Sequence, residues 1–245
     1  MKKILLIAIA FNIFFLYGCS NENNNKTAHH EKGKKIAKVY ESDNEYLTQI
    51  ALMRGHLHVG IELYKNGYID NAKMHMKHPK SELYSDIIPT FKAKNSEGFT
   101  VELENLASAV EGEEDFKFIS SKYKNLSDAI AINENYINDS SRLLAERIIL
   151  VRSLLEIAAD EYAVGIVNGK VENKFEYQDA LGFTIVAKNI LKKTATQSKE
   201  EEIKKNKVLE IIENLSDLWP SLVPTGIVDG DAKIILDAVA KINLV

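Results

Sequence analysis

Apolar residues recur at spacings of three and four along most of the chain after residue 40, and this spacing constrains the fold more than any other feature. Such spacing is typical of α-helices with one buried face, whereas runs with the two-residue period of a strand are few. Glycine and proline, which interrupt helices, number only 12 and 4 among 245 residues. We therefore predict an all-α protein that folds as an antiparallel helical bundle with an N-terminal helical-hairpin layer.

Capping residues and turn residues bound the expected helices. Ser42 and Glu45 have the spacing of a capping box, which opens a helix that runs to about residue 66 and stops at Gly67. A boundary near residue 138 divides the hairpin layer at 41–138 from a C-terminal bundle at 139–245. The other expected helices cover 68–77, a segment from about 80 that is bent or broken at Pro89, 99–110, 114–137, 140–167, 173–194, 198–218 and 231–242.

The first residues have the pattern of a secretory signal. Lys2 and Lys3 precede an apolar run from residue 4 to 17, which is shorter than the roughly 20 residues of a membrane-spanning helix. Gly18 and Cys19 then complete a lipobox, so we predict a bacterial lipoprotein signal peptide at 1–18 and acylation of Cys19, for example with palmitate. An ordinary signal peptide or an anchor helix is the alternative. The polar segment 19–40 is expected to be a flexible tether.

The predicted lipid places the mature protein at a membrane surface. Cys19 is the only cysteine, which excludes a disulfide, a cysteine metal site and the attachment of haem c. Ser20 follows it where an aspartate would act as the inner-membrane retention signal of enteric bacteria. We therefore expect anchoring in membrane lipid at the periplasmic face of the outer membrane rather than of the inner membrane.

Charge and motifs exclude several classes of function. The formal net charge is −4, which is not the basic footprint of a nucleic-acid-binding protein. The sequence has no Gly-x-Ser-x-Gly elbow, phosphate-binding loop, dinucleotide fingerprint or His-Glu-x-x-His pair. We therefore expect a binding protein rather than an enzyme.

Histidine and methionine are concentrated in one part of the chain. Residues 79–245 contain neither, whereas residues 53–78 hold four histidines and three methionines. Imidazole and thioether together suit copper, and Gly67 would let the two helices that carry them fold back on each other. The alternative is that these side chains fill gaps in the core. The candidate metal ligands are Met53, His56, His58, Glu62, Met74, His75, Met76 and His78.

A segment in the C-terminal half resembles a known family. Residues 154–183 are similar to the helical extracytoplasmic domain that precedes the membrane part of bacterial high-affinity iron permeases, and a weaker similarity continues through Trp219 to the C-terminus. The resemblance implies a helical bundle associated with metal uptake and a membrane permease or cytochrome as partner. The chain has no membrane block after residue 18, so it would be a free-standing relative of that domain. The matching residues are Asp160, Tyr162, Gly165, Gly169, Lys170, Val171, Glu176, Tyr177 and Phe183.

Four carboxylates flank the turn in this segment and form a second candidate site. Hard oxygen ligands of this kind suit Fe(III) or Ca(II). Alternatively, Glu176 caps its helix and Asp160 bonds a tyrosine hydroxyl or a backbone amide. Gly169 is expected to have a positive φ in the turn. The candidate residues are Asp160, Glu161, Glu176 and Asp179.

These observations predict a lipid-anchored periplasmic protein that binds iron or copper for uptake or for delivery to a membrane partner. The alternative is a helical scaffold that binds another cell-envelope protein and no metal.

Overall fold

A computed structural model of the protein describes residues 39–245, apart from the side chains of residues 78, 81 and 82. Cys19, the predicted signal peptide and most of the predicted tether lie outside the described residues. The described helices are α1 (Asp43–Lys65), α2 (Ile69–His78), α3 (Ser85–Ala93), α4 (Thr100–Glu111), α5 (Phe116–Asn133), α6 (Leu144–Gly165), α7 (Lys174–Lys193), α8 (Lys199–Glu213) and α9 (Ala232–Asn243). Because the only strands in residues 39–245 are β1 (Ile166–Val167) and β2 (Lys170–Val171), the predicted all-α class is confirmed.

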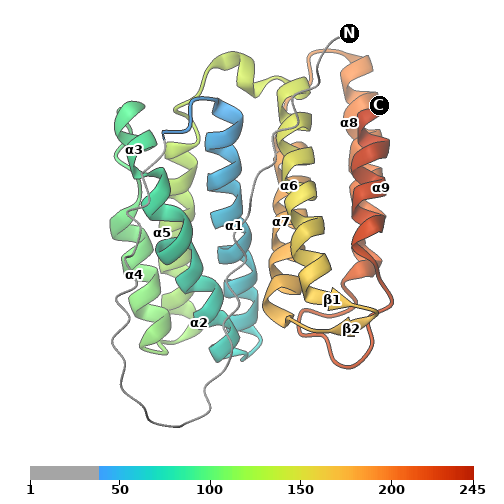
Figure 1. Cartoon of the computed structure of the whole chain (residues 1–245). Coiled ribbons are helices and arrows are strands. Elements are labelled where there is room, and N and C mark those ends of the chain that lie inside the picture. Colours follow the sequence, from blue (N-terminus) through green and yellow to red (C-terminus); the bar gives the residue numbers. More distant parts are fainter. Residues whose placement is uncertain (1–38) are drawn as a thin grey trace, which may run out of the picture. The chain divides into compact units, whose positions relative to one another are not determined.

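Helix α1 lies at the centre of the arrangement (Figure 1). It packs against α2 and α5 on one side and against α6 and α7 on the other, while α8 and α9 cover the outer faces of α7 and α6. Fully buried side chains such as Tyr46 and Leu63 on α1 and Leu155 on α6 belong to one continuous hydrophobic core. Residues 39–245 thus belong to one compact unit.

Local signals in the sequence explain where several helices begin. Ser42 accepts a hydrogen bond from the Glu45 amide and Glu45 reaches back to the Ser42 amide, so the predicted capping box is formed. Ser198 likewise accepts a hydrogen bond from the Glu201 amide at the start of α8. Short polar side chains are effective there because the first amides of a helix have no partner within it.

Pro89 does not break the helix that contains it, contrary to the predicted break. Helix α2 ends at His78, and the chain continues through a single π-helical segment, Pro79–Tyr84, directly into α3. Pro89 lies inside α3. A π-helical turn shifts the hydrogen-bond pattern and leaves some carbonyl groups without an amide partner, so the helix can accept a residue that has no amide hydrogen.

The turn between α6 and α7 is a tight β-hairpin. Asn168 and Gly169 have φ of 51° and 72°, which confirms the positive φ predicted for Gly169 and matches the preference of two-residue hairpin turns. Strands β1 and β2 pair antiparallel, with Ile166 opposite Val171. The hairpin therefore reverses the chain and sets α6 and α7 antiparallel to each other.

Asp43 ties the first turn of α1 to the segment that precedes α6. Its Oδ2 accepts hydrogen bonds from the Asn138 amide at 2.7 Å and from the Ser141 hydroxyl at 2.8 Å, and Lys94 forms an ion pair with its Oδ1 at 2.7 Å. Burial alone would raise the pKa of Asp43, but these partners lower it to about 2. The charged carboxylate thus links the start of α1 to the segment that precedes α6.

Within residues 39–245, no helix combines the length and the apolar composition that crossing a membrane requires.

Candidate metal site

One oxygen of Asp179 is the centre of the candidate site. Asp179 Oδ1 lies 2.6 Å from His56 Nδ1 and 2.9 Å from His75 Nδ1. The three residues come from α7, α1 and α2, and 104 residues separate His75 from Asp179 in the sequence. Tertiary packing therefore creates this cluster, which we call the His–Asp triad.

Close helix contacts bring the triad together. Glycines at 55 and 182 let the backbones of α1 and α7 touch, since a Cβ atom at position 182 would lie 2.5 Å from the carbonyl oxygen of Gly55. His56 follows Gly55 directly, and Asp179 lies one turn before Gly182. Gly67, with φ of 82°, allows the chain to reverse between α1 and α2 so that His75 faces the same point.

The triad is almost closed to solvent. The side chains of His75 and Asp179 are 0% and 2% exposed, whereas that of His56 is 11% exposed. Two aromatic rings form its apolar walls: Phe183 packs edge-on against His56 at 5.2 Å between ring centroids, and Phe175 packs against His75 at 5.9 Å. Charges interact more strongly in such a low-dielectric environment, and His56 is the member closest to solvent.

Electrostatics within the triad favour charged groups despite their burial. Burial alone would lower the pKa of His75, but the hydrogen bond and charge of Asp179 outweigh it and raise that pKa above its usual value. Burial alone would raise the pKa of Asp179, yet His56 and His75 hold it well below its usual range. The carboxylate is therefore ionised at neutral pH and can serve as a metal ligand.

The triad offers two imidazole nitrogens and one carboxylate oxygen that all lie within 4.8 Å of one another. A transition-metal ion bound at about 2.1 Å to each ligand holds neighbouring ligand atoms roughly 3.0–3.4 Å apart. The two contacts to Asp179 Oδ1, at 2.6 and 2.9 Å, would have to lengthen by only a few tenths of an ångström. The arrangement thus offers three ligand atoms to an ion, once the side chains adjust to its ligand distances.

The other members of the predicted histidine and methionine set lie in different environments. Met53 and Met76 are buried in the hydrophobic core, where Met76 packs against Gly60 of α1. Met74 is exposed, and Glu62 forms an ion pair with Lys65 at 3.6 Å.

The two remaining histidines of this set differ in how they are placed. His58 is half-buried, and burial lowers its pKa. The side chain of His78 lies outside the described part of the structure. Of the eight candidate ligands predicted here, the structure brings His56 and His75 together around a carboxylate that the sequence had assigned to the other site.

The predicted acidic set is divided by the fold. Asp179 joins the histidines, whereas Asp160 is exposed at the surface of α6. Glu161 is half-buried and shares a hydrogen bond with Glu176, and burial together with the charge of Glu176 raises the pKa of Glu161 to about 9. Glu176 also accepts a hydrogen bond from the Asn173 side chain at 3.3 Å. Glu161 therefore keeps its proton at neutral pH, and this proton is shared with Glu176 in the hydrogen bond beside the triad.

The raised pKa of Glu161 predicts an unusual dependence of stability on pH. Between pH 4.5 and 9 the folded chain holds a proton that the unfolded chain has released, so stability falls as pH rises, by up to about 1.4 kcal/mol per unit. Glu161→Gln keeps a neutral hydrogen-bonding group and removes this dependence. We expect the variant to be more stable than the wild type at pH 8 but not at pH 4.5, as measured by urea denaturation. An equal difference at both pH values would contradict the shared proton.

The structure adds one polar residue to the site that sequence reasoning missed. Gln178 is fully buried, and its Oε1 lies 2.9 Å from His75 Nε2. Nothing in the local sequence distinguishes this glutamine from a surface residue. Its position directly before Asp179, on a helix that carries the resemblance to iron permeases, was the one available signal.

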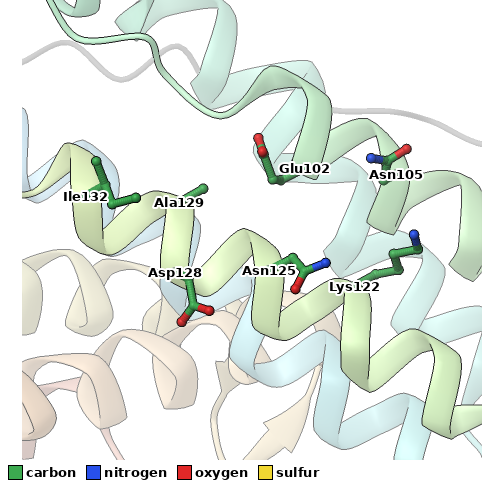
Figure 2. A pocket seen from close by; sticks show the side chains of 7 residues that line it. All are labelled: Glu102, Asn105, Lys122, Asn125, Asp128, Ala129 and Ile132. Atoms are coloured by element: carbon green, nitrogen blue, oxygen red, sulfur yellow. The ribbon is translucent and has the colours of Figure 1, made fainter.

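A separate pocket lies between α4 and α5, and Figure 2 shows the seven side chains that line it. Glu102 and Asn105 come from α4, and the others come from α5. None of the triad residues lines it, and its Asp128 is paired with Lys124 at 2.6 Å. The triad is therefore the stronger candidate for a functional site.

Comparison with known proteins bears on the C-terminal part of the chain. No curated protein and no solved structure matches the chain at a significant level. Residues 138–244 match the model of a protein family described as the iron permease-associated 4-helix bundle domain. This range contains the four helices α6 to α9 and supplies Asp179 and Gln178 to the site. The predicted resemblance to the helical domain of iron permeases is thus confirmed, and residues 138–244 are related to the iron permease-associated 4-helix bundle domain.

Proposed function

We propose that this protein binds an iron ion at the His–Asp triad and passes it to a membrane partner of the iron-permease type. The observation that carries the proposal is the convergence of His56 and His75 on Asp179, because Asp179 lies in the domain related to iron permeases. The protein acts in this proposal as a carrier of iron rather than as a catalyst.

The donor atoms favour iron over Cu(I). Two imidazole nitrogens and a carboxylate oxygen form a mixed set that suits iron, whereas Cu(I) prefers the softer thioether sulfur. The expectation of copper depended on methionines, and Met53 and Met76 are buried in the core while Met74 is exposed. The partly negative surroundings, with Asp179 ionised and Glu161 and Glu176 sharing one proton, favour a cation over an anion.

Exchange of the ion with a partner requires that the site be accessible from solvent. His56 is the triad residue that retains solvent exposure, so we infer that the ion enters and leaves on its side. An acylated Cys19 at the start of the tether would hold the helical body beside the periplasmic face of a membrane, with outer-membrane anchoring favoured by Ser20. In this position, the bound iron would be delivered to a permease or a cytochrome.

Removal of one triad histidine tests the proposal. We expect His56→Ala to weaken iron binding at least about 100-fold, because even residues that only orient a ligand typically contribute 10–100-fold. His58→Ala is the matched control, since it lies on the same helix and is half-buried but is not a member of the triad. Titration calorimetry of the purified protein with Fe(II), and competition experiments for Fe(III), Cu(II) and Zn(II), measure the affinities.

Two results would overturn the proposal. The first is a wild-type dissociation constant for iron weaker than about 10 µM, or roughly −7 kcal/mol. That result, together with a protein partner recovered by crosslinking, would favour the scaffold function instead. The second is an equal loss of affinity in the His56 and His58 variants.

A further inference from the structure

Gln178 lies between the triad and the segment that follows Trp219. Its side chain is fully buried and makes two hydrogen bonds in opposite directions. Gln178 Nε2 donates to the carbonyl oxygen of Leu222 at 2.9 Å, and Gln178 Oε1 lies 2.9 Å from His75 Nε2. A buried amide with both ends engaged has a single orientation.

The orientation of this amide determines that Nε2 of His75 carries a hydrogen. A backbone carbonyl can only accept, so the NH₂ group of Gln178 must face Leu222. The carbonyl end of Gln178 must then face His75, and it too can only accept. His75 Nε2 therefore donates, while Nδ1 faces the carboxylate of Asp179 and carries the hydrogen that a bound ion would replace.

We propose that Gln178 is a positioning residue for metal binding, which holds His75 with a hydrogen on Nε2 and presents Nδ1 to the ion. This inference rests on the proposed function of the triad. Histidines that bind metals usually donate their other ring nitrogen to an oxygen, which fixes the plane of the ring and strengthens the ligand. Gln178 supplies that oxygen from the residue adjacent to Asp179, so one turn of α7 positions one ligand and provides another.

The segment around Leu222 does not depend on Gln178 alone for its position. The Tyr177 hydroxyl donates to the carbonyl oxygen of Ser221 at 2.9 Å, and the Trp219 indole donates to the Tyr177 carbonyl at 3.0 Å. Three hydrogen bonds thus hold this segment on α7. Of the three, only the bond from Gln178 involves a side chain that also contacts the triad. Tyr177→Phe removes one of the three and leaves His75 untouched, so it is a matched control.

The test compares three variants of the full chain at one pH. Gln178→Leu removes the acceptor and the donor, and we expect it to weaken Fe(II) binding about 10–100-fold. Gln178→Glu keeps an acceptor for His75 Nε2 and is expected to bind Fe(II) as tightly as the wild type or more tightly. Tyr177→Phe is expected to bind Fe(II) within about threefold of the wild type. Nitrogen-15 NMR of the histidine rings in the metal-free protein should show the Nε2 hydrogen on His75 in every variant except Gln178→Leu.

Each outcome bears on the inference separately from the proposed function. Loss of the Nε2 hydrogen in Gln178→Glu, or its retention in Gln178→Leu, would overturn the role of Gln178 even if no metal bound. Equal weakening by Gln178→Leu and Tyr177→Phe would overturn it by showing that only the docking of the segment matters. If Gln178→Leu does not fold, the Nε2 hydrogen of His75 in the Gln178→Glu variant tests the inference. Failure of the wild type to bind iron would instead overturn the proposed function.

Discussion

Replacing Asp179 with asparagine should lower the free energy of unfolding by about 3 kcal/mol at pH 7, because it leaves two buried imidazoles without the charge that pairs with them. The change preserves the shape of the side chain, so the effect isolates the charge. His56 and His75 both contact the same oxygen of Asp179, and neither substitution of a single histidine would remove both contacts. Iron binding should be lost with the same change if the triad is the iron site.

The pH dependence of this effect has a definite sign. The pKa of Asp179 is lowered by the histidines, so its contribution to stability is present above the pKa of the unfolded chain, about 3.9, and is lost as pH falls towards the lower folded value. The difference between wild type and Asp179→Asn should therefore be large at pH 6 and shrink below pH 4. Urea denaturation across this range measures it.

Asp160→Asn is the control for a nearby carboxylate. Asp160 is exposed on α6, and surface substitutions usually change stability by less than about 0.5 kcal/mol. An equal loss of stability in both variants, or a loss in Asp179→Asn that does not change below pH 4, would show that charge pairing in the triad does not stabilise the fold.

The sequence predicts the helices well because their signals are local. The spacing of apolar residues indicates a helix within a few turns, and Ser42 with Glu45 marks its start within four residues. Gly169 was predictable for the same reason, since a two-residue turn needs a positive φ at that place. The break predicted at Pro89 was wrong, and the π-helical turn that precedes α3 has no signal in the composition.

The site was predictable only in part, because its geometry is tertiary. Local enrichment selected His56 and His75, and charge near the turn selected Asp179. Periodicity shows which residues share a face of one helix, but it does not show which helix packs against that face. The sequence therefore assigned His75 and Asp179 to different sites although they are 2.9 Å apart. The buried methionines illustrate the converse, since an uneven distribution of a residue type can arise from core packing alone.

The contact between α1 and α7 should be the least tolerant point of the fold. At Gly182 an added methyl group would meet the backbone of Gly55, with 2.5 Å to its carbonyl oxygen and 2.9 Å to its carbonyl carbon. Backbone atoms cannot move aside as the end of a flexible side chain can. We expect Gly182→Ala to destabilise the protein by about 3 kcal/mol, at the upper end for overpacked cores, although alanine is the better helix former.

Gly60→Ala is the control, because the atoms it would meet belong to the flexible side chain of Met76, with 2.9 Å to its terminal Cε. We expect a change within about 1 kcal/mol there, since methionine can adopt another rotamer and the gain in helix propensity offsets part of the cost. Both values come from urea denaturation at pH 7. Similar losses in the two variants would show that contact with backbone atoms is no less tolerant than contact with a flexible side chain.

The Gly182 variant also connects stability with the site. His56 is adjacent to Gly55 and Asp179 precedes Gly182 by one turn, so any separation of the two backbones lengthens the 2.6 Å contact between them. His75 comes from α2, which packs on α1, so its bonds to Asp179 and Gln178 on α7 depend on the same helix contact. In Gly182→Ala protein that remains folded, iron affinity should therefore fall, and nitrogen-15 NMR should show a weakened bond between His75 and Gln178. An affinity equal to that of the wild type would mean that the position of His56 does not depend on this helix contact.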